Sequence, residues 1–402
     1  MKKFFCLFFA LILPCTLLPL RVDAASTVTL NVYNWGEYIS DGSEGSMDVN
    51  AAFEDYYYKI TGQRVRINYT TYASNEDMYN KIRSGATSYD VIVPSDYMIE
   101  RMIAEDMLRP LDYSNIPNFR YIDPDYTQLY FDPDNLYTVP YTYGMVGIIY
   151  NTTMVKQADV TDWDCMWNEK YKGKILQFNN SRDALGTAMY KLGIDVNTTD
   201  QTELRTAVEE LKVQKPLIQS YVMDEIFNKM KTGSAAIAPY YAGDFLAMYE
   251  DNNALAFSYP QSGTNVFVDA FCIPKDSRNP AIAEAYINFM LSKEPASANA
   301  EFLYYACPNT LVPEDEEYRQ TMTEVHPDAM TILYPDTTDF TVSYYENLDA
   351  DTLAYTGTLW EELKIENSIE PWILWSAGAI LALVIGLLLF KYIRAAYRAR
   401  QY

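Results

Sequence analysis

The sequence predicts an α/β fold with two lobes, a cleft between them, and an apolar segment at each end of the chain. Strand-like and helix-like patterns alternate from residue 29 onward, which is typical of a mainly parallel sheet covered by helices. About 345 residues lie between the apolar ends, which is too long for one ordinary domain and comfortable for two. Two further apolar runs, 144–150 and 267–274, interrupt the alternation and are expected to cross between the lobes.

The first lobe is predicted from three successive strand–helix units. We expect strands at 29–33, 65–69 and 91–93, and helices at 47–60, 74–85 and 95–103. Ser74 with Asp77 three residues later resembles a capping box, which supports the start of the second helix. Ligands of such sheets bind beyond the carboxyl ends of the strands. Four side chains follow a predicted strand end and are expected at that edge: Trp35, Tyr38, Ser95 and Tyr97.

The second lobe repeats the strand–helix pattern after the first crossing. We expect strands at 174–178 and 235–239 and helices at 184–192, 202–213 and 223–231, and then, after the return crossing at 267–274, a helix at 279–290. These units place residues 25–143 and 270–340 in lobe 1 and residues 144–269 in lobe 2. Residues 341–368 are expected to form a C-terminal helical segment that packs on the lobes.

The two ends of the chain carry targeting signals in this interpretation. Two lysines precede an apolar run that ends in a small-residue motif, so residues 1–24 are predicted to be a signal peptide, with an uncleaved anchor as the alternative. Residues 373–390 lack charge and have about the length of a membrane span, and basic residues follow them. We therefore predict a transmembrane helix at 372–392, a short basic cytoplasmic tail at 393–402, and a single-pass protein of the cell membrane whose folded part is extracellular.

Charge and composition exclude several classes of function. The formal net charge of −23 argues against nucleic-acid binding, which needs a basic surface, and favours cationic ligands. The chain has one histidine, His326, so a histidine triad or a multi-histidine metal site is not expected. Cys165, Cys272 and Cys307 form no CxxC pair, so neither a zinc site nor a disulfide framework is indicated. We expect no cofactor and no metal.

The segment Tyr33-Asn34-Trp35-Gly36-Glu37-Tyr38 carries the first chemical signal. It places aromatic rings and a carboxylate where the first strand runs into a loop. Aromatic faces attract an organic cation, and the Glu37 carboxylate can pair with its ammonium. The alternative is that the rings of Trp35 and Tyr38 pack into the core. By itself this segment does not decide between the two interpretations.

Four motifs, in order along the chain, resemble the extracytoplasmic spermidine/putrescine-binding proteins of ABC importers. They are residues 33–38, 72–79, 94–97 and 305–309. The resemblance runs from about Leu30 to Leu363 and implies the type II periplasmic-binding-protein clamshell. It also implies a monomeric receptor, not an enzyme, that captures putrescine or spermidine outside the cell. The expected partners are the polyamine and the permease subunits of an ABC transporter.

The resemblance further implies which residues form the ligand site. They are Trp35, Glu37, Tyr38, Ser95, Tyr97, Asp183, Tyr241, Phe267, Asp269 and Tyr305. Asn180 stands where the family has an acidic residue, and Glu346 matches a final polar contact loosely. Each buried ammonium needs a carboxylate or several acceptors, because an unpaired buried charge is costly. Asn180 supplies one anion fewer, so the choice between spermidine and putrescine, which has one ammonium fewer, stays open.

Two other functions compete with this hypothesis. Tyr240-Tyr241 and Tyr304-Tyr305 are adjacent tyrosine pairs whose phenolates could bind ferric iron in a clamshell of the same kind. Against iron, the single histidine is distant in sequence from both pairs, and the loop around Trp35 fits an organic ligand better. Paired carboxylates of an extracellular glycosidase are the second alternative, but carboxylates are too plentiful here to be specific.

Overall fold

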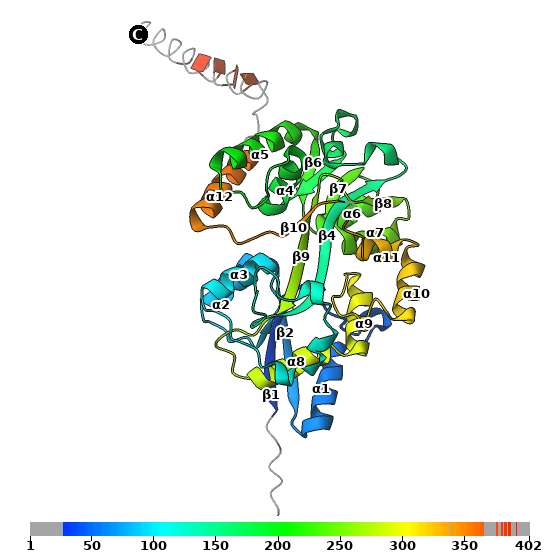
Figure 1. Ribbon diagram of the computed structural model, residues 1–402. Coiled ribbons are helices and arrows are strands. Elements are labelled where there is room, and N and C mark those ends of the chain that lie inside the picture. The colour runs from blue at the N-terminus through cyan, green and yellow to red at the C-terminus, as the bar shows by residue number, and fades with distance from the viewer. Residues whose placement is uncertain are drawn as a thin grey trace, which may run out of the picture.

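The computed structural model describes residues 27–338 and 340–365, together with residues 375, 376, 379, 380, 382, 383, 385, 386 and 391. The predicted signal peptide lies outside these residues, and so does most of the predicted membrane-spanning segment. Within the described parts of the chain, we find no helix with the length and apolar character needed to cross a membrane. Figure 1 shows two lobes, each built from a sheet with helices around it.

The first lobe contains a parallel three-stranded sheet in the order β2-β1-β3. Its strands are β1 (Val28–Trp35), β2 (Val65–Tyr72) and β3 (Val91–Ile92), and its helices are α1 (Val49–Thr61), α2 (Asn75–Arg83) and α3 (Asp96–Ala104). Leu30, Val32 and Phe53 are fully or almost fully buried between the sheet and α1. The predicted N-cap at Ser74 is confirmed, because the Asp77 backbone N–H donates to Ser74 Oγ at 3.1 Å. The three predicted strand–helix units are therefore present.

The second sheet has the order β10-β9-β4-β7-β5-β6, and β8 also pairs with β4. Its strands are β4 (Val139–Asn151), β5 (Ile175–Phe178), β6 (Ile218–Val222), β7 (Ile237–Tyr241), β8 (Leu255–Ser258), β9 (Thr264–Phe271) and β10 (Val342–Ser343). Its flanking helices include α4 (Ser181–Leu192), α5 (Gln201–Gln214), α6 (Glu225–Lys231) and α7 (Ala242–Asp251). The predicted strands of the second lobe correspond to β5 and β7, whereas β6 and β8 had no clear pattern in the sequence.

Strands β4 and β9 run as a long antiparallel pair from one lobe into the other (Figure 1). Every residue of β4 is buried. Isolated bridges join Ser95 to Asp269, within β9, and Ile92 to Cys272, the residue after β9, so the same strand also borders the sheet of the first lobe. The two apolar runs that were predicted to cross between the lobes are therefore this pair of strands.

The remaining helices cover both lobes. They are α8 (Pro280–Met290), α9 (Lys293–Leu303), α10 (Glu316–Val325), α11 (Ala329–Leu333) and α12 (Ala350–Ile365). Helices α8 and α9 pack on α1, α10 and α11 pack on α7, and α12 packs on α5 and α4. Short 3-10 helices lie at Ser43–Gly45, Tyr113–Asn115, Pro117–Tyr121, Pro124–Tyr126, Gln157–Asp159, Trp163–Trp167, Glu169–Tyr171 and Lys215–Leu217. Cys165, Cys272 and Cys307 are buried free thiols.

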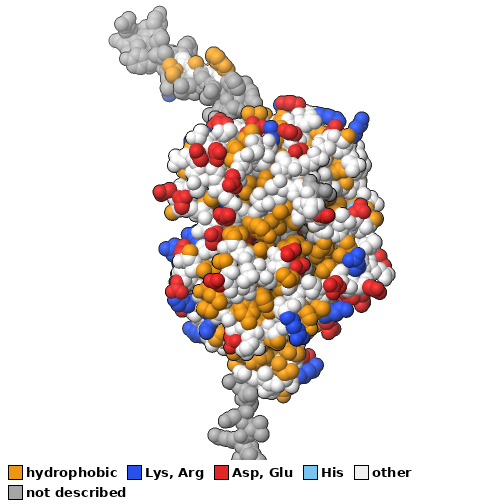
Figure 2. Space-filling view, viewed as in Figure 1, with side chains coloured by type: hydrophobic (Ala, Val, Ile, Leu, Met, Phe, Trp, Pro, Cys, Tyr) orange, Lys and Arg blue, Asp and Glu red, His pale blue; other side chains and the backbone are white. Residues whose placement is uncertain are grey.

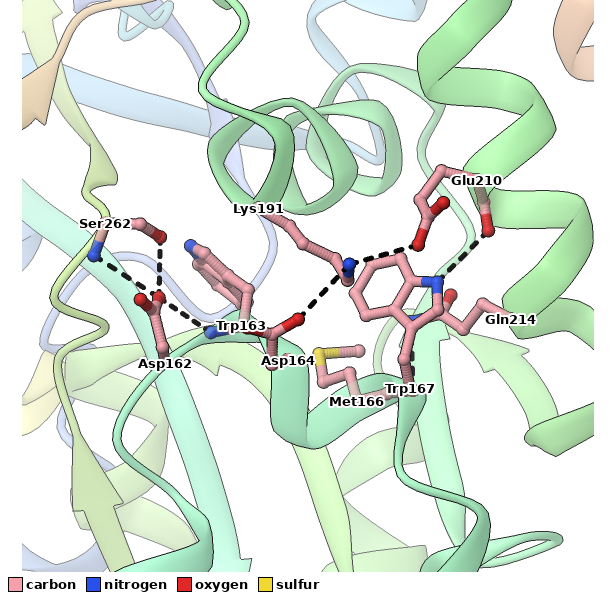
Figure 3. A network of polar contacts seen from close by, with 9 residues as sticks. All are labelled: Asp162, Trp163, Asp164, Met166, Trp167, Lys191, Glu210, Gln214 and Ser262. Carbon is pink, nitrogen blue, oxygen red and sulfur yellow. Dashed lines mark hydrogen bonds and ion pairs between the residues drawn. The ribbon is translucent and has the colours of Figure 1, made fainter.

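A polar network holds the turn before β9 to the second lobe (Figure 3). The buried Trp163 ring donates its Nε1–H to the Gly263 carbonyl at 2.8 Å. Lys191, on α4, forms ion pairs with Asp164 and Glu210, both at 3.2 Å. Because β9 begins next to Gly263, this network fixes the start of the strand that carries Phe267 and Asp269.

Candidate ligand-binding site

A cleft of about 2530 Å³ lies between the lobes, and all twelve residues named from the sequence line it. Fifteen Asp or Glu and four Lys or Arg residues line the cleft, so its field favours cations. On the face shown in Figure 2, hydrophobic side chains gather at the waist where the lobes meet. The cleft exceeds the roughly 300–1,000 Å³ of ordinary small-ligand sites, so a small ligand would occupy only part of it.

The loop after β1 is held in place by its own side chains. The Asn34 amide accepts the Trp35 N–H at 2.8 Å and donates to the Tyr38 carbonyl at 3.1 Å. The Trp35 indole N–H donates to the Val93 carbonyl at 3.0 Å, which ties this ring to the end of β3. Glu37 adopts a left-handed backbone with φ of 50°, and its side chain is exposed at the cleft. The structure thus supplies one wall of the cleft from this loop.

Asp269 is the central carboxylate of the cleft. The Tyr38 hydroxyl donates to Asp269 Oδ2 at 2.7 Å and lies 2.5 Å from Thr142 Oγ1. Asp269 is only 4% exposed, and its Oδ1 atom has no hydrogen-bond partner among the described residues. Burial raises the pKa of Asp269 to about 6, and the hydroxyls of Ser95 and Tyr38 oppose the rise. A buried carboxylate oxygen without a partner costs free energy until a donor reaches it.

Ser95 and Tyr97 lie beside Asp269 at the start of α3. Ser95 pairs with Asp269 through an isolated backbone bridge. The Tyr97 hydroxyl accepts from Asn75 Nδ2 at 3.1 Å and donates to Glu76 Oε1 at 3.2 Å. Burial raises the pKa of Tyr97 well above its ordinary value, so this phenol stays neutral. Both residues therefore reach the cleft as neutral polar groups.

Asp183 and Tyr241 form the opposite wall, on the second lobe. The Tyr241 hydroxyl donates to Asp183 Oδ2 at 3.0 Å. Burial raises the pKa of Asp183 to about 6, and the Tyr241 hydrogen bond and the nearby Arg182 charge oppose the rise. Asn180 is the N-cap of α4, since its Oδ1 accepts the Arg182 N–H at 2.9 Å. Asn180 thus explains the helix start while also lining the cleft.

A continuous row of rings links the two carboxylate walls. Ring centroids lie 5.7 Å apart for Tyr38 and Tyr305, 6.0 Å for Tyr305 and Phe267, and 5.4 Å for Phe267 and Tyr241. All three pairs meet edge to face. Tyr38 at one end is bonded to Asp269, and Tyr241 at the other is bonded to Asp183. The row offers apolar surface between two anionic groups.

Sequence reasoning missed Asp244, a third carboxylate in the cleft wall. It lies in the first turn of α7 and accepts the Tyr305 hydroxyl at 2.9 Å. Burial raises the pKa of Asp244 to about 7, and the Tyr305 hydrogen bond opposes the rise. The signal in the sequence was its position just past the strand that ends at Tyr241. The same edge rule that selected Trp35 could therefore have found it.

Glu346 lies at the edge of the cleft with an exposed side chain. Its main chain makes the ordered contacts, because its N–H donates to Asn197 Oδ1 at 2.9 Å and its carbonyl accepts from Arg182 at 3.1 Å. A side-chain role of Glu346 in binding stays a prediction, as do the binding roles of the other eleven residues.

The tyrosine pairs proposed for ferric iron do not have the chemistry of phenolate ligands. Burial raises the pKa values of Tyr240, Tyr241 and Tyr305 far above the ordinary range. Tyr304 and Tyr305 donate their hydroxyl protons to Glu250 and Asp244. These phenols are hydrogen-bond donors to carboxylates, which is the opposite of what a tyrosinate metal site requires.

Comparison with curated proteins shows close relatives over most of the chain. The spermidine/putrescine-binding periplasmic protein of Salmonella typhimurium is 30% identical over 343 residues, covering 85% of this chain and 93% of the relative. The putrescine-binding periplasmic protein PotF of Escherichia coli is 29% identical over 307 residues, covering 71% of this chain and 79% of the relative. The similarity therefore includes both lobes and the cleft between them.

A solved structure supports the same relationship. The spermidine/putrescine ABC transporter substrate-binding protein PotD of Streptococcus pneumoniae superposes with a TM-score of 0.70 at 34% identity. The alignment covers 84% of this chain and 99% of that chain. The two-lobed α/β periplasmic-binding-protein fold predicted from the sequence is thereby confirmed.

The predicted location needs correction. The sequence predicted a single-pass protein of the cell membrane with a cytoplasmic C-terminus. The curated relatives are instead named periplasmic proteins, and the described residues contain no helix that could span a bilayer. The prediction relied on the uncharged run at 373–390 and on the basic residues after it, and these findings contradict it.

The family follows from a comparison with profiles of known protein families. The profile described as bacterial extracellular solute-binding protein matches residues 51–323, which is about two thirds of the chain. This family consists of receptors that bind solutes, not of enzymes. Together with the 30% identity over 85% of its length, the match shows that the chain belongs to the bacterial extracellular solute-binding proteins.

Proposed function

We propose that the chain is a receptor that captures a linear polyamine, putrescine or spermidine, in the cleft and delivers it to the permease of an ABC importer. The observation that carries this proposal is Asp269 Oδ1, a buried carboxylate oxygen without a hydrogen-bond partner among the described residues. A primary ammonium would satisfy this oxygen and neutralise its charge. The names of the curated relatives, which specify spermidine and putrescine, support the same class of ligand.

The row of rings explains how the rest of the ligand would be held. A polyamine is a string of ammonium groups separated by methylenes. Its methylenes would lie against Phe267, Tyr305 and Tyr241, where each ring attracts a neighbouring ammonium by about 0.5–2 kcal/mol. Asp269 and Asp183 would pair with ammonium groups at opposite ends, and Trp35, Glu37, Tyr38, Ser95 and Tyr97 would enclose the Asp269 end.

Asp244 raises the number of carboxylates that could pair with the ammonium groups of the ligand above the number implied by the sequence. Asn180 serves as a helix cap and carries no charge, which argued for the shorter diamine. Asp244 adds a half-buried carboxylate, and its partner Tyr305 belongs to the row of rings between Asp269 and Asp183. The cleft therefore has enough anions for the three ammonium groups of spermidine as well as the two of putrescine.

Binding would proceed by closure of the lobes. Asp269 and Asp183 come from opposite walls of the cleft, so a ligand that contacts both stabilises the closed arrangement. The receptor would act as a monomer and present the closed form to the permease. Nothing in this mechanism requires covalent chemistry or a cofactor.

Calorimetric titration of the full chain tests this proposal. Putrescine, spermidine and spermine are the ligands, while glutamate, 1,4-butanediol and ferric citrate are the comparison solutes. We expect saturable binding of at least one polyamine with one ligand per chain, and no binding of the uncharged diol. Absence of heat with every polyamine, or equal binding of the diol, would overturn the proposal.

A further inference from the structure

A short segment, residues 342–349, borders the cleft and is called the strap here. It begins with β10 and ends where α12 starts, and Figure 1 shows it passing between the lobes. Tyr345, Glu346, Asn347 and Leu348 all line the cleft. Side chains from both lobes form hydrogen bonds with the main chain of the strap.

On the second lobe, Asn197 and Arg182 hold the strap. The Asn197 amide accepts the Glu346 N–H at 2.9 Å and donates to the Tyr344 carbonyl at 2.8 Å. Arg182 donates to Asn197 Oδ1 at 2.7 Å and to the Glu346 carbonyl at 3.1 Å, and its guanidinium lies 4.8 Å from the Tyr345 ring centroid. Because Arg182 precedes Asp183 on α4, these contacts join the strap to the carboxylate wall.

On the first lobe, Glu100 and Tyr130 hold the same segment. Glu100, on α3, accepts the Asn347 N–H through Oε2 at 2.7 Å. The Tyr130 hydroxyl donates to the Tyr345 carbonyl. A hydrogen bond from a main-chain N–H to a carboxylate is among the stronger kinds in proteins. Adjacent residues of one short segment are therefore bonded to opposite lobes.

We propose that Glu100 and Asn197 are positioning residues for ligand binding. Glu100 holds the strap from the first lobe and Asn197 holds it from the second. The strap therefore moves when the lobes close. Its cleft-lining residues enclose the ligand only while both hydrogen bonds persist. The inference rests on the proposed function, because it assigns a role in retaining the polyamine. It predicts that loss of either contact shortens the lifetime of the complex.

Dissociation rates measured by stopped-flow fluorescence with spermidine test this role in the full chain. Glu100→Ala removes the acceptor for the Asn347 N–H, and we expect dissociation to be faster by about tenfold. Glu100→Gln keeps an acceptor oxygen, so its rate is expected within about twofold of wild type. Asn197→Ala should act in the same direction as Glu100→Ala. The double variant should show less than the product of the two effects, since both act through one strap.

Glu54→Ala is the matched control. Glu54 accepts the Ile67 N–H at 2.8 Å within the first lobe, which is the same kind of bond away from the cleft. Its removal should leave the dissociation rate unchanged, and melting temperatures of the ligand-free variants show whether each one folds. Wild-type rates in Glu100→Ala and Asn197→Ala, or equal acceleration by Glu54→Ala, would overturn the inference alone. If wild type binds putrescine but not spermidine, the same rates are measured with putrescine; absence of binding of every polyamine by wild type would overturn the proposed function and this role with it.

Discussion

Three aspartates in the cleft share one environment. Asp183 and Asp269 are buried and Asp244 is half-buried, and each accepts a hydrogen bond from one tyrosine hydroxyl. Burial raises their pKa values to about 6, about 7 and about 6. A tyrosine hydroxyl cannot neutralise a carboxylate, so the ligand-free cleft carries charge that is only partly compensated. These groups therefore favour a cation over any neutral or anionic solute.

Asp269→Asn tests the contribution of the central carboxylate. We expect polyamine affinity to fall by about 100-fold or more, because an ammonium would lose a charged partner in a desolvated site. Calorimetry with putrescine and spermidine measures the loss. Asp112→Asn is the control, since Asp112 is an aspartate that caps a turn outside the cleft. Wild-type affinity in Asp269→Asn would show that the ligand site lies elsewhere.

The raised pKa values predict opposite pH dependences for binding and for stability. Below pH 6 the cleft carboxyls hold protons, and a cation must displace them, which costs about tenfold in affinity at pH 5 for each carboxyl with a pKa of about 6. Calorimetry at pH 8 and pH 5 should show this loss, with protons released on binding at pH 5. Affinity that is constant over this range would contradict the burial of the carboxylates.

Stability of the ligand-free chain should change in the other direction. An aspartate in the unfolded chain titrates near pH ~3.9, so the folded chain holds more protons between pH 4 and 7. The contribution of these three groups to stability is fully present below pH ~4 and is lost as the pH rises through 6 to 7. Urea unfolding of wild type and Asp269→Asn should therefore converge below pH ~4 and diverge progressively up to pH ~8, with the variant more stable.

At the scale of elements, strand β4 supports the rings of the cleft. A Cβ atom on Gly144 would lie 2.7 Å from Phe267 Cζ and 3.3 Å from Tyr305 Cδ1. Glycine is therefore needed here because two cleft rings pack directly on the main chain of β4. The same strand accommodates Pro140 through a register shift between Pro140 and Thr142 in its pairing with β9. Strand β4 begins at Val139, five residues before the apolar run that predicted it.

Gly144→Ala tests this support. We expect displacement of the two rings, a loss of about 1–3 kcal/mol in the free energy of unfolding, and a clear fall in polyamine affinity. Gly147→Ala is the matched control on the same strand, because its Cβ would meet the Phe257 ring outside the cleft. The control should lose stability and keep its affinity. Equal affinity in both variants would show that the positions of Phe267 and Tyr305 do not matter for binding.

Much of the element order, and the placement of the candidate site residues at one cleft, could be predicted from sequence, for local reasons. Asp269 stood out because it interrupts an apolar crossing strand, and Trp35 and Tyr97 because they follow strand ends. Asp244 did not stand out, because an acid in the first turn of a helix is common for reasons of the helix dipole. Asn180 was interpreted only as a lost anion of the ligand site. Its role as the N-cap of α4 could not be predicted, because the exact first residue of the helix was not known from sequence. Strands β6 and β8 are only partly buried and lack a clear period.

At the scale of the whole molecule, the cleft between the lobes is the feature that predicts motion on ligand binding. Its volume of about 2530 Å³ is several times that of an ordinary small-ligand site, and the paired carboxylates lie on opposite walls. A diamine or triamine that pairs with both carboxylates would hold the two walls together. The antiparallel pair β4 and β9 runs through both lobes, so we expect the lobes to rotate about these two strands.

Small-angle X-ray scattering measures this closure directly. We expect the radius of gyration of wild type to fall on addition of saturating spermidine. The radius should not change with 1,4-butanediol, which has the length of putrescine and lacks its charges, or with spermidine added to Asp269→Asn. An unchanged radius in wild type at saturation would mean that the ligand binds without lobe closure.

The most direct test of the account is a crystal structure of the chain grown with spermidine. The account predicts an ammonium nitrogen about 2.8 Å from Asp269 Oδ1, the oxygen that lacks a partner in the ligand-free cleft. It also predicts methylenes against Phe267 and a second ammonium at Asp183. Spermidine bound outside the cleft, or in the cleft with Asp269 Oδ1 still without a partner, would contradict the account.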